Sequence, residues 1–162
     1  MKTKTPWLKA KIIGADVSAA LAKQDLLELI KQTGYVDDPK ALISAVEERD
    51  KTVGAQIREN IFVYHAATPA VNHLCAATAV CVEGDKKTAY ALVAYKQKNY
   101  FCLKRLAALL EAILDLTGAT QKSFFAKKTF STSQEFTNCL EDFFKGSGIS
   151  IFDKEADEDL QA

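Results

Sequence analysis

The chain has 162 residues, of which 48% are hydrophobic and 26% are charged, a composition that fits one globular domain with a substantial core. Basic and acidic residues both number 21, so the formal net charge is zero and no overall field favours nucleic acid or an anionic membrane. The N-terminus lacks the apolar stretch of a signal peptide, and no later segment is long enough to cross a bilayer. We therefore expect a cytoplasmic protein with no direct membrane insertion.

The first elements are predicted from caps and periodicity. Residues 8–13 indicate an edge strand, because two lysines interrupt its apolar pattern. A helix follows, with Asp16 or Ser18 as its N-cap and Gly34 at its end. Asp38 and Pro39 begin a second helix that should end near residue 49 or 50, and residues 51–58 are predicted as a loop.

The middle of the chain predicts a sheet covered on both faces. Residues 60–67 form a short, mainly apolar run with a histidine, His65, near its end, and residues 74–82 and 89–95 indicate an antiparallel hairpin beside it. These runs are apolar without strict alternation, which is typical of strands buried on both sides. Helices must supply the cover.

Helical covers follow the hairpin directly. Apolar residues recur at helical spacing between Leu103 and Leu114, and Gly118 ends this run. Residues 132–135 read Thr-Ser-Gln-Glu, a capping box that opens a last helix ending at Gly146. We expect residues 1–150 to form the domain and residues 151–162 to form a solvated acidic tail.

The candidate for chemistry is His65, at the exit of the strand over residues 60–67. Arg49 precedes it by sixteen residues and Glu59 by six. A neutral imidazole is a candidate nucleophile, although a lone histidine after an apolar strand is more often structural. No second ligand stands three or four residues from either histidine, and the four cysteines form no C-x-x-C pair, so neither a metal site nor a disulfide framework is predicted.

This pattern resembles the fructose, mannitol and nitrogen-regulatory class of phosphotransferase-system (PTS) enzyme IIA. The matching positions are Arg49, Ile57, Glu59, Ile61, Val63 and His65, together with residues 34–37 and 103–109. The resemblance covers roughly residues 15 to 145. It implies a three-layer α/β/α fold, in which helices flank a mixed, partly antiparallel sheet.

The resemblance also implies a phosphocarrier function without a cofactor. His65 would accept a phosphoryl group from the phosphorylated histidine-carrier protein and pass it to an enzyme IIB. Arg49 would stabilise the transition state, with support from the backbone N–H groups of Ala66 and Ala67. Glu59 would orient Arg49 or the imidazole.

The sequence departs from this family next to the histidine. Tyr64 stands where the family usually has proline, and Cys102 stands at the place of the family's second histidine. These departures leave two alternatives open. One is a regulatory binding module with weak or lost phosphotransfer that recognises a target protein, and the other is a structural or oligomerising domain.

Overall fold

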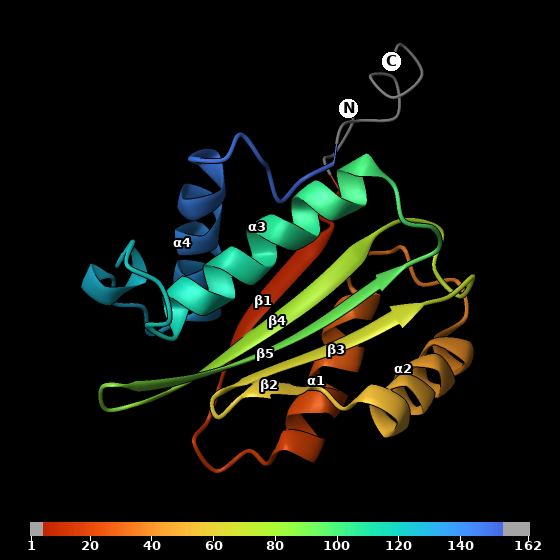
Figure 1. Cartoon of the computed structure of the whole chain (residues 1–162), viewed down its shortest axis with the longest axis horizontal. Helices are drawn as coiled ribbons and strands as arrows, with labels where there is room; N and C mark the ends of the chain where they lie inside the picture. The colour runs from red at the N-terminus through yellow and green to blue at the C-terminus, as the bar shows by residue number, and fades with distance from the viewer. Residues whose placement is uncertain (1–4, 154–162) are drawn as a thin grey trace.

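The computed structural model describes residues 5–153, which form an open mixed sheet with helices on both faces (Figure 1). The strand order is β1-β4-β5-β3-β2, in which β1 runs parallel to β4 and β3 parallel to β5, while the β4–β5 and β2–β3 pairs are antiparallel. The strands are β1 (Leu8–Ile13), β2 (Gln56–Arg58), β3 (Ile61–Ala67), β4 (Cys75–Glu83) and β5 (Lys86–Tyr95). The helices are α1 (Ala19–Lys31), α2 (Pro39–Val53), α3 (Tyr100–Leu116), the 3-10 helix η1 (Phe125–Lys127) and α4 (Ser133–Lys145).

Two separate cores lie on the two faces of this sheet. In β5, Ala91 and Val93 pack with α3 and α4, while the alternate residues Leu92 and Ala94 pack with α1 and α2. Figure 1 shows α3 crossing one face of the sheet and α1 lying behind the other. The predicted three-layer arrangement is therefore confirmed, because successive side chains of a strand point to opposite faces and both faces are apolar here.

Side-chain caps begin the helices where the sequence predicted them. Ser18 accepts a hydrogen bond from the Leu21 N–H at 3.2 Å, which selects Ser18 over Asp16 as the N-cap of α1. The Asp38 carboxylate accepts from the N–H of Ala41 at 3.1 Å at the start of α2. Such caps satisfy N–H groups that the first turn of a helix leaves without partners.

Three predicted boundaries differ from the structure. Helix α2 continues to Val53, and the predicted loop over residues 51–58 contains the short strand β2, because the carbonyl of Ala55 accepts a hydrogen bond from Val63 of β3 at 2.8 Å. Helix α3 begins at Tyr100 rather than near Leu103. Leu103 is 53% exposed, so it does not belong to the core as its helical spacing indicated.

The end of the described chain is buried rather than solvated. Asp153 lies in a cluster, here called the Asp153 cluster, that also contains Tyr35, His73 and Arg105. Its carboxylate accepts the Tyr35 hydroxyl at 2.6 Å, pairs with the Arg105 guanidinium at 2.7 Å and lies 3.6 Å from Nε2 of His73. Residues 151–153 therefore pack against the domain and do not begin a solvated tail, and the rest of the predicted tail, residues 154–162, lies outside the described part of the chain.

Candidate functional site

His65 lies at the open edge of the sheet. It pairs in register with Val93 of β5 on one side of β3. On the other side, β2 pairs only with the beginning of β3, through Gln56 with Phe62 and Arg58 with Ile61. No strand therefore covers His65 from that side within residues 5–153, and its side chain is half-buried.

Helix α2 brings Arg49 to this edge. Arg49 and His65 line one cavity of about 270 Å³, together with Asp50, Tyr64 and apolar residues of α2, β2, β3 and α3. Arg49 is exposed, and it forms no ion pair with a carboxylate of residues 5–153, whereas the neighbouring Asp50 pairs with Lys23 at 3.7 Å. The guanidinium therefore remains available to an anion that enters the cavity.

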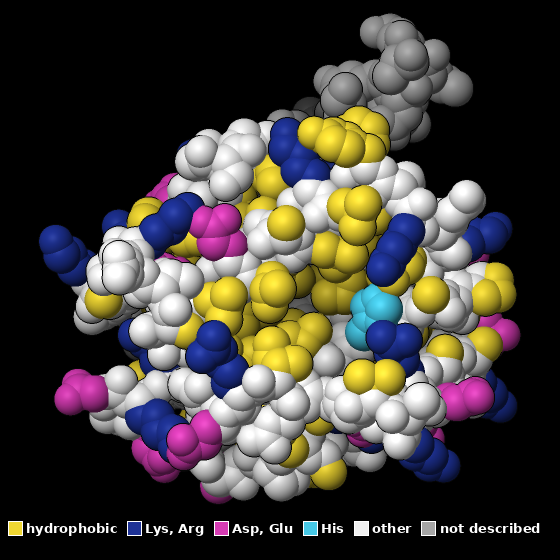
Figure 2. Space-filling model, viewed as in Figure 1, with side chains coloured by type: hydrophobic (Ala, Val, Ile, Leu, Met, Phe, Trp, Pro, Cys, Tyr) yellow, Lys and Arg dark blue, Asp and Glu magenta, His cyan; other side chains and the backbone are white. Residues whose placement is uncertain are grey.

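A second, apolar cavity of about 150 Å³ adjoins His65 beneath α3. It is lined by His65 and by Val63, Ala91, Val93, Leu106, Leu109, Leu110 and Ile113. Figure 2 shows a hollow with hydrophobic side chains on this face, with a histidine and basic side chains at its rim. The imidazole thus stands between a charged opening and an apolar interior.

Tyr95 makes the direct contact to the imidazole. Its hydroxyl lies 2.6 Å from Nε2 of His65, and the two rings are tilted by 55° with centroids 5.0 Å apart. Tyr95 ends β5 two residues after Val93, the residue that pairs with His65. Alternate residues of a strand point to the same face, so the side chains of Tyr95 and His65 lie on the same face of the sheet. The Tyr95 side chain is buried, and the Lys98 ammonium lies 5.9 Å from the centre of its ring.

The surroundings keep His65 neutral. Burial lowers the pKa of His65 below its ordinary value of 6.5, and the positive charges of Arg49 and Lys98 lower this pKa further. At neutral pH the imidazole consequently carries one N–H and one nitrogen lone pair. Such a ring can act as a nucleophile without a separate base.

The backbone of β3 also presents donors at this edge. The Val63 N–H donates outward to Ala55, while the Thr68 N–H donates inward to the carbonyl of Tyr95 in β5. Because N–H directions alternate along a strand, the N–H groups of His65 and Ala67 point outward toward α2, whereas that of Ala66 points toward β5. The outward donors are therefore at positions 65 and 67 and not at 66.

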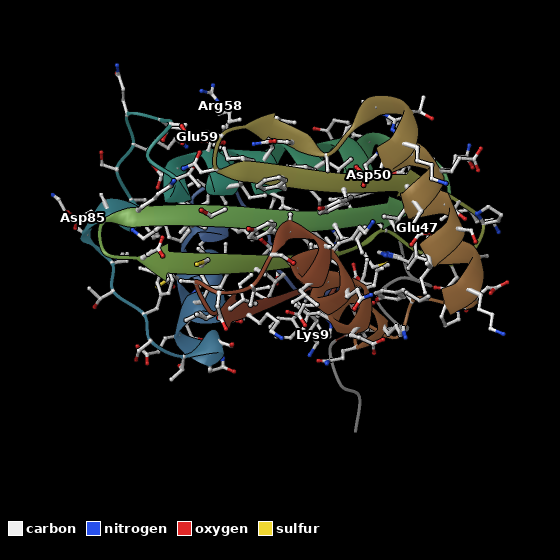
Figure 3. The ribbon with its side chains drawn as sticks, turned by 90° about the horizontal axis from the view of Figure 1, so that it is seen from below. Lys9, Glu47, Asp50, Arg58, Glu59 and Asp85 are labelled. Atoms are coloured by element: carbon white, nitrogen blue, oxygen red, sulfur yellow. The ribbon has the colours of Figure 1, made fainter. Side chains whose placement is uncertain are left out.

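The structure does not bring Glu59 to His65. Glu59 is 89% exposed at the side chain and lies 3.8 Å from Lys86, which begins β5. Lys86 precedes the His65 partner Val93 by seven residues, or roughly 23 Å along an extended strand. Figure 3 shows the same separation, with Glu59 at one end of the sheet and Asp50 of α2 toward the other.

Cys102 is likewise apart from the imidazole. It is buried in the first turn of α3, where its N–H donates to the Asn99 side chain at 2.9 Å and its thiol donates to the carbonyl of Gln97 at 3.6 Å. It lines a cavity of about 520 Å³ at the Asp153 cluster, and neither cavity lined by His65 includes it.

Sequence reasoning missed Tyr95 and Lys98. Both residues stand at or just after the end of the strand over residues 89–95. That strand pairs in parallel with the His65 strand, so its end lies beside the imidazole. The sequence indicated the hairpin but not which of its strands adjoins β3, so the contact could not be derived. No group of three or more potential metal ligands occurs among residues 5–153, and no helix there has the length and apolarity to cross a membrane.

Comparisons with known proteins bear on the fold. No protein-family model and no curated protein matches the sequence. Among solved structures, the IIA mannitol protein of Escherichia coli is similar with a TM-score of 0.51 and 17% identity, covering 86% of this chain and 99% of that one. A provisionally assigned PTS IIA domain of Streptococcus pyogenes M1 GAS is similar with a TM-score of 0.50 and 15% identity, covering 82% of this chain and 90% of that one. The described part of this chain therefore has the fold of PTS IIA domains.

Proposed function

We propose that this protein is a phosphocarrier of the PTS IIA type, in which His65 accepts a phosphoryl group from the phosphorylated histidine-carrier protein and passes it to an enzyme IIB. The observation that carries this proposal is a neutral, half-buried imidazole at an open sheet edge, with the cations Arg49 and Lys98 close enough to lower its pKa. The similarity of the fold to PTS IIA domains supports it. The reaction would take place in the cytoplasm and needs no metal or cofactor.

The transfer step balances without a separate acid or base. A nitrogen lone pair of His65 attacks phosphorus, and the bond between phosphorus and the carrier's imidazole nitrogen breaks. That bond's electron pair returns to the carrier's ring, which keeps the proton on its other nitrogen and so leaves as a neutral imidazole. The other nitrogen of His65 keeps its proton, so the phosphorylated ring is poised to act as a leaving group when an enzyme IIB attacks.

Electrostatics would supply the stabilisation of the transition state. Negative charge is spread over the equatorial oxygens of the transferring group, so a nearby guanidinium and backbone N–H donors stabilise it. We assign this role to Arg49 with Lys98, assisted by the outward N–H groups of His65 and Ala67. Glu59 has no part in this proposal, because it lies at the other end of β3.

An apolar rim around the cavity would receive the carrier protein. Val53, Ile57 and Leu110 line the cavity with 63%, 51% and 41% of their surface exposed. Exposed apolar residues gathered around a polar opening are typical of protein interaction sites. Docking there would exclude water from the phosphoryl group and bring it to His65.

The test is phosphoryl transfer from a reconstituted PTS. The protein is incubated with labelled phosphoenolpyruvate, enzyme I and the histidine-carrier protein, and acid-labile label is measured. We expect stoichiometric label that is lost in His65→Ala and kept in His73→Ala, the matched control for the second histidine of the chain. An unlabelled wild-type protein, or label that persists in His65→Ala, would contradict the proposal.

The hydrogen bond between Tyr95 and His65 favours a second candidate, a regulatory IIA-like module that binds a target protein and transfers phosphate weakly or not at all. The Tyr95 hydroxyl occupies Nε2, one of the two nitrogens that could attack. Such a module would bind its target through the same apolar rim. Target binding by His65→Ala that equals wild-type binding, together with no label in the transfer assay, would select this candidate.

A further inference from the structure

The contact between Tyr95 and His65 determines which nitrogen of the imidazole carries its proton. The distance of 2.6 Å between the hydroxyl oxygen and Nε2 is that of a short hydrogen bond. Nδ1 of His65 has no hydrogen-bond partner among residues 5–153. Either group could formally donate, so the direction must be decided by chemistry.

The phenol is the donor in this pair. A tyrosine hydroxyl, with an ordinary pKa near 10, gives up its proton far more readily than a neutral imidazole N–H, and the imidazole lone pair is the stronger acceptor. Neutral His65 therefore accepts the hydroxyl proton at Nε2 and carries its own proton on Nδ1. In this tautomer Nε2 has the only lone pair in the plane of the ring, and that lone pair already accepts the hydrogen bond from Tyr95.

We propose that Tyr95 gates His65: its hydroxyl fixes the tautomer in which Nε2 has the lone pair, and it covers that lone pair until the Tyr95 side chain turns aside and donates its hydrogen bond to an oxygen of the incoming phosphoryl group. This inference rests on the proposed function only for the identity of the physiological donor. Tyr95 acts through His65 and is thus a positioning residue.

The packing of Tyr95 explains why the cap persists. Its ring is buried in the core beneath α3, with 3% of its surface exposed, and Lys98 lies over the ring. The hydroxyl oxygen therefore stands where a bond between Nε2 and phosphorus would form, so phosphorylation requires the Tyr95 side chain to turn aside and take its hydroxyl off Nε2. An arriving phosphoryl oxygen next to Nε2 offers a charged acceptor, which a hydroxyl prefers to a neutral one.

Potassium phosphoramidate tests the gate without any PTS partner. In this reaction the Nε2 lone pair of His65 attacks phosphorus, the phosphorus–nitrogen bond of the reagent breaks, and its nitrogen leaves as ammonia with a proton from the solvent. At pH 8 His65 is neutral both with and without the Tyr95 hydroxyl. Tyr95→Phe also admits the Nε2–H tautomer, in which Nε2 has no lone pair, so the rate of phosphorylation at Nε2 is divided by the fraction of rings with a free Nε2 lone pair, measured by nitrogen-15 NMR. We expect this corrected rate to rise by roughly 3- to 10-fold, as removal of one hydrogen bond to the lone pair implies.

Two controls accompany this rate measurement. The rate at His73, followed in the same samples by mass spectrometry, should not change. Tyr90→Phe removes a hydroxyl from a buried ring of the same strand on the opposite face of the sheet, and it should leave the His65 rate unchanged. An equal or lower corrected rate in Tyr95→Phe would overturn the inference.

The tautomer gives a second, independent measurement on the wild-type protein. Nitrogen-15 NMR of the imidazole should place the proton of neutral His65 on Nδ1, and Tyr95→Phe should add the Nε2–H tautomer. A wild-type protein with its proton on Nε2 would refute the gate even if the variant failed to fold. Accelerated reaction with phosphoramidate but no transfer from the histidine-carrier protein would refute the proposed function and leave the gate intact.

Discussion

Asp153→Ala should destabilise the protein strongly, although residue 153 stands at the end of the described chain. The Asp153 carboxylate is 9% exposed and its partner Arg105 is 18% exposed at the side chain, so this is a largely buried ion pair. Removing one member of a buried pair costs about 3–5 kcal/mol, because the remaining charge is left without compensation. The Arg105 guanidinium stays partly exposed to solvent and lies 5.2 Å from the centre of the Trp7 ring. Both contacts stabilise its charge when Asp153 is removed, so we expect a loss at the lower end of this range, about 3 kcal/mol.

Urea unfolding followed by tryptophan fluorescence measures this loss directly. Trp7 is the chain's single tryptophan and contacts Arg105, so its emission reports on the affected region. A loss of 3 kcal/mol corresponds to a fall in Tm of roughly 6 to 12 °C in a domain of this size. Asp142→Ala is the matched control, since Asp142 forms an exposed i,i+3 pair with Lys145 and should cost less than about 0.5 kcal/mol.

A double-mutant cycle identifies the source of the effect. If the ion pair is responsible, Asp153→Ala combined with Arg105→Ala should cost clearly less than the sum of the two single variants. A loss below about 1 kcal/mol for Asp153→Ala, or additive losses in the cycle, would refute the reasoning.

Three further predictions concern pH. Burial lowers the pKa of His65, and Arg49 and Lys98 lower it further, so NMR should show His65 titrating below 6.5. Arg49→Gln and Lys98→Gln should each raise that pKa. A lower or unchanged pKa in these variants would contradict the role given to the two cations. Because the unfolded chain then binds more protons than the folded one, His65 should also reduce stability as the pH falls below about 6.5. Burial, with the hydrogen bond to Asp153, raises the pKa of Tyr35 above its ordinary value of 10, so stability should fall as the pH rises above 10; Tyr35→Phe should show a smaller fall, and an equal one would exclude Tyr35 as the cause.

The elements that sequence predicted well are those with local signals. The caps at Ser18, Asp38 and Thr132 depend on one side chain and a nearby backbone N–H, and all three begin helices. The apolar stripe Phe136, Leu140, Phe143 and Phe144 of α4 is buried for the same local reason of helical spacing. Strand β2 had no such signal, because its three residues are exposed and gain their structure from pairing with β3.

The site was predictable only in part because spacing in sequence does not give distance. Arg49 is sixteen residues from His65 and lines the same cavity, while Glu59 is six residues away and lies near the other end of the strand. An extended strand moves about 3.3 Å per residue, whereas the helix and turn before β2 fold the chain back. Tyr95 and Lys98 depend on the parallel pairing of β3 and β5, which is a long-range property of the sheet.

Gly54 connects these observations, because it is where α2 ends and the chain turns back along β3. Its φ of 78° is in the left-handed region that glycine adopts without strain, and no heavy atom would meet an added Cβ within 4 Å, so the requirement for glycine is one of conformation and not of space. Only Ala55 separates this turn from β2, because α2 ends at Val53 and β2 begins at Gln56. The residues before the turn are helical, so β2 cannot continue beside the second half of β3. The same turn therefore leaves the edge open at His65 and sets the last turns of α2, with Arg49, over that opening.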